Sequence, residues 1–261
     1  MSPKKIISFA LWGDSGCYNY GALENALLAP RIYPGWICRF YIGKGVYPEV
    51  VQKLKKLSHV EIVDRTREGS GYNAKNMLWR HLPFFSSDDS IVLSRDTDSV
   101  LNPREAWCVR QWMESGKNFH IIRDHGGHAS NAIMGGMFGS YSKFMVRFKS
   151  NWEDFYQKLS TANPNRGADQ QFLKGIYPSV TRECYIHAGK EVPKGDALFS
   201  EEPAPHSIPD LGYLGSNGSG YIGSPEYPHR PPCSFPLVKE VYNLELKNQK
   251  KVQQYSDDVE L

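Results

Sequence analysis

The stretch IVLSRDTDSVL, residues 91–101, combines a buried-strand pattern with an abrupt change to charge. Its first residues are apolar and predict a strand, and Arg95, Asp96 and Asp98 follow at once. Carboxylates are costly to place beside a core unless an arginine, a metal ion or water compensates their charge. The first question for the sequence is therefore which partner these two aspartates have.

Strands and helices alternate on both sides of this stretch. Apolar runs predict strands at residues 5–12, 36–43, 60–65, 90–96 and 118–124, and helical spacing with start and stop signals predicts helices at residues 22–29, 48–57, 73–85 and 103–116. Two further helices are expected at residues 150–160 and from about residue 167, and irregular loops from residue 193. This alternation predicts an α/β fold with a mostly parallel sheet flanked by helices.

The length of 261 residues suits one large domain or two small ones and is ample for a sizeable core. We expect residues 1–192 to form this domain, and residues 193–261, rich in Pro and Gly at first and polar at the end, to pack on it as loops and a tail. The glycines of segment 193–234 are consistent either with a lid over a ligand or with a packed loop.

Composition excludes several classes of function. The 31 basic and 28 acidic residues nearly balance, so we expect no nucleic-acid partner. No apolar run reaches the ~18–20 residues that span a bilayer, so no transmembrane segment is expected. The five cysteines form no CxxC pair, which argues against a zinc site or a disulfide framework and favours a reducing compartment. The apolar start reads as a first strand rather than a signal peptide, so we expect a cytoplasmic location, or the host cytoplasm if the chain is viral.

Polar residues follow three of the predicted strands. Asp96 and Asp98 come after one, Asp124 after another, and a loop with Tyr18 and Asn19 after the first. Because ligands of open α/β sheets bind at the carboxyl ends of the strands, these residues are expected to meet at one edge.

The Asp-x-Asp spacing has a chemical use. Both carboxylates can face one hard cation, Mg²⁺ or Mn²⁺, which shares its coordination shell with phosphate oxygens. Such an ion neutralises charge that develops on a leaving diphosphate. The plain alternative is a solvated turn in which Asp96 pairs with Arg95.

Three longer segments carry a resemblance to a known family. They are VLSRDTDSVLNPREAWCVRQWMES (92–115), FHIIRDHGGHASNAIMGGMFGS (119–140) and GADQQFL (167–173). In this order they resemble a family of small GT-A-type glycosyltransferases of bacteria and large DNA viruses, over roughly residues 75–190. The resemblance implies a GT-A-like fold and metal-dependent transfer of a sugar from a nucleoside-diphosphate sugar to a hydroxyl of a glycan or other acceptor.

The resemblance also implies roles for single residues. The metal would be held by Asp98, Asp96 and His187, although the family has an acidic residue after this histidine where this sequence has Ala188. The donor would be bound by Ala10, Trp12, Tyr18, Asn19, Lys75, Arg80, Arg95, Asp96, Gly135 and Gly136. If the reaction inverts the anomeric centre, Asp169 or Asp124 would be the general base, and we favour Asp169. A retaining reaction needs no base in that place.

The histidines allow more than one interpretation. His120 alternates within a predicted strand and is expected in the core. His125 and His128 follow Asp124, and they fit either a structural loop or the binding of the donor sugar or the acceptor.

Two other functions fit parts of the pattern. SRDTDSVL is a loose match to the haloacid-dehalogenase-type phosphatase signature, with Asp96 as nucleophile and Asp98 as general acid, but that signature usually lies on the first strand. A non-catalytic sugar-nucleotide or glycan-binding module would be expected to lose the Asp-x-Asp pair, and both aspartates are present.

Overall fold

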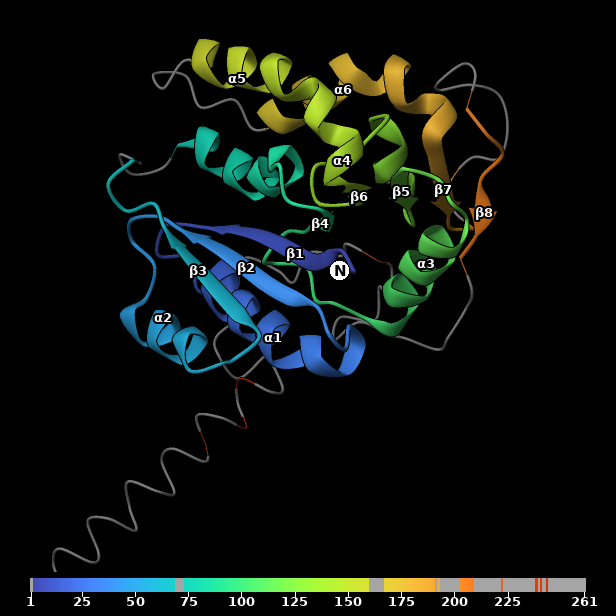
Figure 1. Cartoon of the computed structure of the whole chain (residues 1–261). Coiled ribbons are helices and arrows are strands. Elements are labelled where there is room, and N and C mark those ends of the chain that lie inside the picture. Colours follow the sequence, from blue (N-terminus) through green and yellow to red (C-terminus); the bar gives the residue numbers. More distant parts are fainter. Residues whose placement is uncertain are drawn as a thin grey trace, which may run out of the picture.

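A single eight-stranded sheet organises the part of the chain that the computed structural model describes, which is residues 2–68, 73–159, 167–190, 192, 202–208, 222, 238, 240 and 243. Its strand order is β3-β2-β1-β4-β6-β5-β7-β8 (Figure 1). The elements, with η for 3₁₀ helices, are β1 (Lys4–Leu11), α1 (Gly16–Ile32), β2 (Ile37–Ile42), α2 (Pro48–Lys55), β3 (Val60–Asp64), η1 (Ala74–Phe85), β4 (Ser90–Ser94), α3 (Pro103–Glu114), β5 (Phe119–Arg123), η2 (Gly126–Ser130), β6 (Phe138–Tyr141), α4 (Ser142–Met145), η3 (Val146–Phe148), α5 (Lys149–Lys158), α6 (Ala168–Val180), η4 (Thr181–Glu183), β7 (Cys184–Ala188) and β8 (His206–Ser207).

All neighbouring strands pair in parallel except those beside β6, which is antiparallel to both β4 and β5. Consequently β1, β4 and β5 all end at the same edge of the sheet. The expected fold class, a mostly parallel sheet flanked by helices, is confirmed.

Helices cover both faces of the sheet, and each face has its own apolar core. In β4, Ile91 and Leu93 pack into the core shared with α1, α2 and α3, while Val92 packs into the core shared with η1, α5 and α6. A strand buried on both faces is apolar at every position, which is why the run before Arg95 lacks the alternation of a half-exposed strand. Figure 1 shows α1 and α2 on one side of the sheet and α4, α5 and α6 on the other.

Local signals begin the helices on either side of β4. Asn102 precedes α3, and its side chain accepts a hydrogen bond from the backbone N–H of Glu105 at 2.9 Å, with Pro103 at the first helical position. Asn73 precedes η1 and accepts from the N–H of Lys75 at 2.9 Å. These caps fix where each helix starts relative to the sheet edge.

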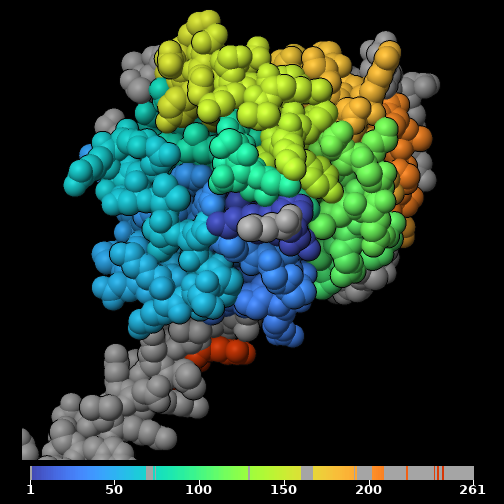
Figure 2. Space-filling model, in the orientation of Figure 1, coloured from blue at the N-terminus to red at the C-terminus, as the bar shows by residue number. Residues whose placement is uncertain are grey.

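The elements from β1 to η1 lie beside those from α3 to β8. Figure 2 shows the blue and cyan residues up to η1 forming one half of this face and the green, yellow and orange residues of α3 to β8 the other. The start of β1 reaches the surface between them.

Several elements differ from the prediction. Helix α1 begins at Gly16 rather than at residue 22, directly after the first loop. Strand β6 and the short strand β8, which pairs with β7, were not predicted. Helix α6 continues to Val180 with Pro178 inside it. The helix predicted at 73–85 is present at Ala74–Phe85 as a 3₁₀ helix.

Little of the C-terminal segment lies within the described residues, and the suggested lid at 193–234 falls almost wholly outside them. Ile222 and Val238 are buried against the domain, and Glu202 forms an ion pair with Arg123 at 2.6 Å. The division at residue 192 remains a prediction.

Within the described residues, no helix combines the length and the apolar character needed to cross a bilayer. The four cysteines described, Cys17, Cys38, Cys108 and Cys184, are buried free thiols.

Candidate active site

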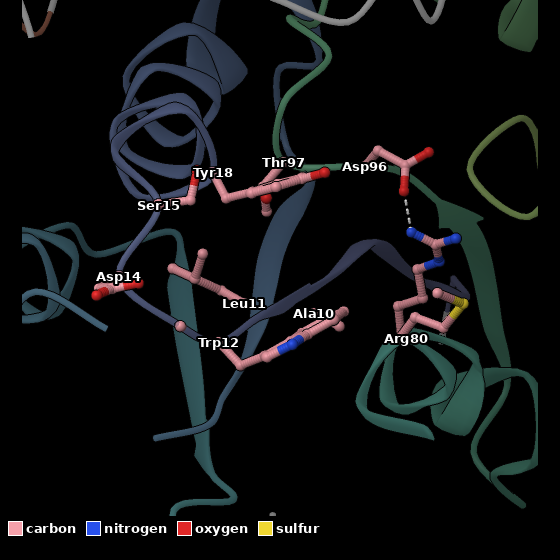
Figure 3. A pocket seen from close by; sticks show the side chains of 11 residues that line it. Ala10, Leu11, Trp12, Asp14, Ser15, Tyr18, Arg80, Asp96 and Thr97 are labelled. Atoms are coloured by element: carbon pink, nitrogen blue, oxygen red, sulfur yellow. Dashed lines mark hydrogen bonds and ion pairs between the residues drawn. The ribbon is translucent and has the colours of Figure 1, made fainter. Parts of the chain in front are cut away.

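A first cavity opens at the edge where β1 and β4 end. It has a volume of about 280 Å³ and is lined by Ala10, Leu11, Trp12, Gly13, Asp14, Ser15, Tyr18, Met77, Arg80, Asp96 and Thr97. Figure 3 shows Trp12 and Tyr18 on opposite sides of this cavity, with Asp14 toward one end and Arg80 and Asp96 at the other. The cavity therefore has charged residues at both ends and aromatic side chains between them.

A second cavity of about 190 Å³ adjoins the first. It is lined by Met77, Arg80, Asp96, His128, Met134, Gly135, Gly136, Met137, Gly167, Asp169 and Gln170. Met77, Arg80 and Asp96 belong to both linings, so the two cavities meet at this charged pair.

Arg80 connects the two cavities electrostatically. Its Nη1 donates to Oδ1 of Asp96, and its Nη2 donates to Oδ2 of Asp169 at 2.7 Å. The side chains of Arg80 and Asp169 are only 8% and 4% exposed, whereas that of Asp96 is 42% exposed. Burial raises the pKa of Asp169, but the charge of Arg80 outweighs this and holds the pKa below its usual value.

Two adjacent glycines make this arrangement possible. A Cβ added at Gly135 would lie 2.6 Å from Cγ of Asp169 and 2.8 Å from Nη2 of Arg80. A Cβ added at Gly136 would lie 2.7 Å from Cγ of Asp96. The resemblance assigned these glycines to donor binding, and the structure shows that they let the two carboxylates lie against the backbone.

The loop that carries the aspartates is held from the opposite side by α1. Asn25 donates to the carbonyl of Ser99 at 2.9 Å and accepts from the N–H of Leu101 at 2.8 Å. Gly21 packs so closely on the carbonyl of Thr97 that no side chain fits between them. Sequence reasoning missed Asn25 because its segment was expected only as a helix face.

Asp98 is half-buried, and its carboxylate lies near that of Asp96. Burial, together with the charge of Asp96, raises the pKa of Asp98 to about 7, although Arg80 acts in the opposite direction. A divalent cation between Asp96 and Asp98 would relieve this repulsion, so the two carboxylates fit a metal such as Mn²⁺ or Mg²⁺. Among the residues described, no group of three or more histidine, cysteine, aspartate or glutamate side chains that could hold a metal ion is present.

His187 does not lie with these aspartates. It is fully buried in β7, three strands away from β4 in the order β4-β6-β5-β7, or roughly 14 Å at ~4.8 Å per strand. Its Nδ1 lies 2.9 Å from Nε2 of His120, which stacks on Trp112 in the core. The structure thus corrects the expected metal set, because His187 belongs to a buried histidine pair.

Arg95 also faces away from the cavities. Its Nε donates to Glu105 at 2.6 Å, and its Nη1 donates to the carbonyls of Ser94 and Phe138 at 2.7 and 3.0 Å. The hydroxyl of Tyr33 donates to the same Glu105 at 2.8 Å. Arg95 therefore links β4 to α3, lines neither cavity, and pairs with Glu105 rather than with Asp96.

Asp124 is held in a separate ion pair. Its two carboxylate oxygens accept from Nη1 and Nη2 of Arg104 at 2.7 and 3.0 Å, and one also accepts from the N–H of Ile222 at 2.8 Å. It lines neither cavity. This geometry does not favour Asp124 as a general base, because its lone pairs already serve a strong bidentate pair.

Two other expected donor contacts have structural roles. The side chain of Asn19 donates to the carbonyls of Gly13 and Ser15 and accepts from the N–H of Tyr47 at 2.9 Å. It shapes the loop after β1 without lining the cavity. The ammonium group of Lys75 lies 4.2 Å from the ring centre of Tyr156, also outside both linings. Of the expected set, the structure brings Ala10, Trp12, Tyr18, Arg80, Asp96, Gly135, Gly136 and Asp169 to the two cavities.

Neither a protein-family model nor a curated protein matches the sequence. Among solved structures, the chain is similar to glucosyl-3-phosphoglycerate synthase from Mycobacterium tuberculosis in complex with Mn²⁺, UDP-glucose and phosphoglyceric acid, with 12% identity over 76% of this chain and 74% of that chain and a TM-score of 0.45. It is also similar to 4-diphosphocytidyl-2C-methyl-D-erythritol synthase from Anaerococcus prevotii (12% identity, 72% and 88% covered, TM-score 0.46) and to a galactosyltransferase in complex with donor and acceptor sugar analogues (16% identity, 70% and 73% covered, TM-score 0.42). At these values the similarity concerns the fold and not the activity.

Proposed function

We propose that the protein is a metal-dependent glycosyltransferase that moves a sugar from a nucleoside-diphosphate sugar to a hydroxyl of a glycan or another acceptor. The observation that carries this proposal is the position of Asp96 and Asp98. Asp96 lies at the junction of one aromatic-sided cavity and one polar cavity, at the ligand-binding edge of the sheet, and Asp98, which lines neither cavity, follows two residues later on the same loop.

The first cavity suits the nucleoside. Trp12 and Tyr18 stand on either side of it and offer flat apolar surfaces to a base, and Tyr18 is 43% exposed, which is unusual for a large aromatic side chain in this structure. The charged end at Arg80 and Asp96 then receives the diphosphate side of the donor.

Asp96 and Asp98 would hold the divalent metal. When bound, the metal stabilises the negative charge that the departing diphosphate acquires. Arg80 fixes one oxygen of Asp96 by its hydrogen bond, so this carboxylate is already oriented before ligand arrives. The loop carrying both aspartates is likewise fixed by Asn25.

The second cavity suits the transferred sugar. It combines carboxylate, amide and imidazole groups with bare glycine backbone, a set of donors and acceptors that matches the hydroxyls of a pyranose ring. Asp169 contributes one wall. Because Arg80 lowers its pKa and both its oxygens already accept hydrogen bonds, Asp169 is better suited to bind a hydroxyl than to take its proton.

The direct test is calorimetry of the purified protein against UDP-, GDP-, CMP- and dTDP-sugars, each with and without Mn²⁺. We expect one nucleotide class to bind, and only when Mn²⁺ is present. An Asp98→Ala variant that is folded should lose this metal-dependent binding. Absence of binding to every compound, with the metal and without it, would contradict the proposal and favour a phosphatase or another binding module.

A further inference from the structure

His128 lines the second cavity together with Asp96 and Asp169. It is 7% exposed, in the short helix η2 that follows β5. Its backbone N–H donates to the carbonyl of His125 at 2.8 Å, which closes the turn that brings the ring back toward the sheet edge. The turn therefore fixes the position of the His128 side chain.

The hydrogen bonding of the ring determines where its proton lies. The backbone N–H of Asp124 points to Nδ1 of His128 at 3.3 Å, so Nδ1 acts as the acceptor. In a neutral imidazole, the nitrogen that does not accept carries the hydrogen. Because the ring is buried, its neutral form is favoured, and Nε2 then carries the proton.

From this geometry we infer that His128 is a specificity-determining residue, whose Nε2–H donates a hydrogen bond to an oxygen of the sugar bound in the second cavity. This inference rests on the proposed function and deepens it, since it assigns one contact to the sugar. The cavity also holds the carboxylates of Asp96 and Asp169, which accept hydrogen bonds, and His128 adds a neutral donor to those of Arg80 and Gln170. A sugar hydroxyl between His128 and a carboxylate would accept a hydrogen bond from the histidine and donate one to the carboxylate.

The test uses three variants. His128→Phe keeps a flat ring and removes the donor, whereas His128→Gln can place an amide N–H where Nε2–H was. His125→Phe is the matched control, because Nδ1 of His125 also accepts a backbone N–H of this loop, from Gly127 at 3.0 Å, but His125 is only partly buried and lines neither cavity.

The measurement compares, by calorimetry with Mn²⁺, each nucleoside diphosphate with its sugar conjugate: UDP with UDP-glucose, GDP with GDP-mannose and dTDP with dTDP-glucose. For the pair that binds the wild-type protein, His128→Phe should leave the affinity for the diphosphate within about twofold and weaken the conjugate by about tenfold, the usual effect of losing one neutral hydrogen bond in a buried site. His128→Gln should recover most of this loss, and His125→Phe should show none of it.

The outcomes separate the two proposals. If the wild-type protein binds no nucleoside diphosphate or conjugate, the proposed function itself is wrong and the role of His128 falls with it. If the wild-type protein binds both and His128→Phe weakens both equally, or neither, then the transferase proposal stands and the assignment of His128 is overturned. In that case the histidine shapes the loop only.

Discussion

The glycine at position 136 offers a sharp test of how the aspartate pair is held. In Gly136→Ala, the new Cβ would lie 2.7 Å from Cγ of Asp96 and 3.2 Å from its backbone nitrogen. Real Cβ atoms essentially never approach other atoms closer than about 3.0 Å, so the carboxylate must turn away. Since Oδ1 of Asp96 is bonded to Arg80, that movement breaks the ion pair at the junction of the two cavities.

We expect two measurable consequences. Overpacking of this kind costs about 1–3 kcal/mol of unfolding free energy, which corresponds to a melting temperature lower by about 2–4 °C per kcal/mol in a chain of this size. Binding of the nucleotide in the presence of Mn²⁺ should fall by at least about tenfold, because Asp96 no longer faces the metal position. Denaturant unfolding and calorimetry measure these effects.

A matched substitution exists in the same molecule. Gly175 lies inside α6, and a Cβ added there would meet no atom within 4 Å. Gly175→Ala should therefore stabilise the protein by about 0.5–1 kcal/mol through helix propensity and leave ligand binding unchanged. If Gly136→Ala behaves like Gly175→Ala in both assays, the reasoning about the close packing of Asp96 is refuted.

Three further predictions follow from the buried charges. Arg80→Met should lower the unfolding free energy by about 3–5 kcal/mol because Asp169 is left buried without its partner, and the double variant with Asp169→Asn should recover part of this loss in denaturant unfolding. Arg95→Met should cost a similar ~3–5 kcal/mol by stranding Glu105, yet the folded protein should bind the nucleotide with unchanged affinity; a loss of affinity in the folded variant would restore a diphosphate role for Arg95. Asp98 has a pKa raised to about 7 in the folded protein, above its value near 4 when unfolded, so its contribution to stability falls as pH rises from about 4 to 7. Asp98→Asn should therefore be more stable than wild type at pH 8 without metal, by roughly 1–2 kcal/mol after allowance for its partial exposure, and equally stable at pH 4; equal stability at both pH values would contradict this account.

Much of the sheet could be predicted because buried strands have strong local signatures. The strands before Trp12 and Arg95 were placed to within one or two residues, since each is a short apolar run bounded by turn residues. Strand β6 was missed because Gly139 and Ser140 stand at its centre, and its pairing with neighbours on both sides outweighs their poor strand propensity. The start of α1 was missed because Gly16 and Asn19 favour loops locally.

The location of the site at one edge of the sheet could be predicted from the sequence, but the contacts between its side chains could not. Convergence of Asp96 with the loop after β1 follows from strand direction alone. The partner of Asp96, Arg80, comes from another element, and Asp169 is 89 residues away from Arg80 in the chain. One signal was available: side chains alternate along a strand, so Arg95 continues the side of Leu93, which packs in the core shared with α3.

The attachment of the aspartate loop to α1 has a consequence for how the protein responds to mutation. Asn25 touches no cavity, yet its hydrogen bonds to Ser99 and Leu101 set the shape of the loop before any ligand arrives. Ligand binding then costs little conformational entropy, because the aspartate loop is already ordered. Amide hydrogens of this loop should exchange slowly even in the free protein. A screen for variants with weakened donor affinity should therefore recover substitutions at Asn25, which is buried on the far side of the loop, as well as substitutions at the aspartates.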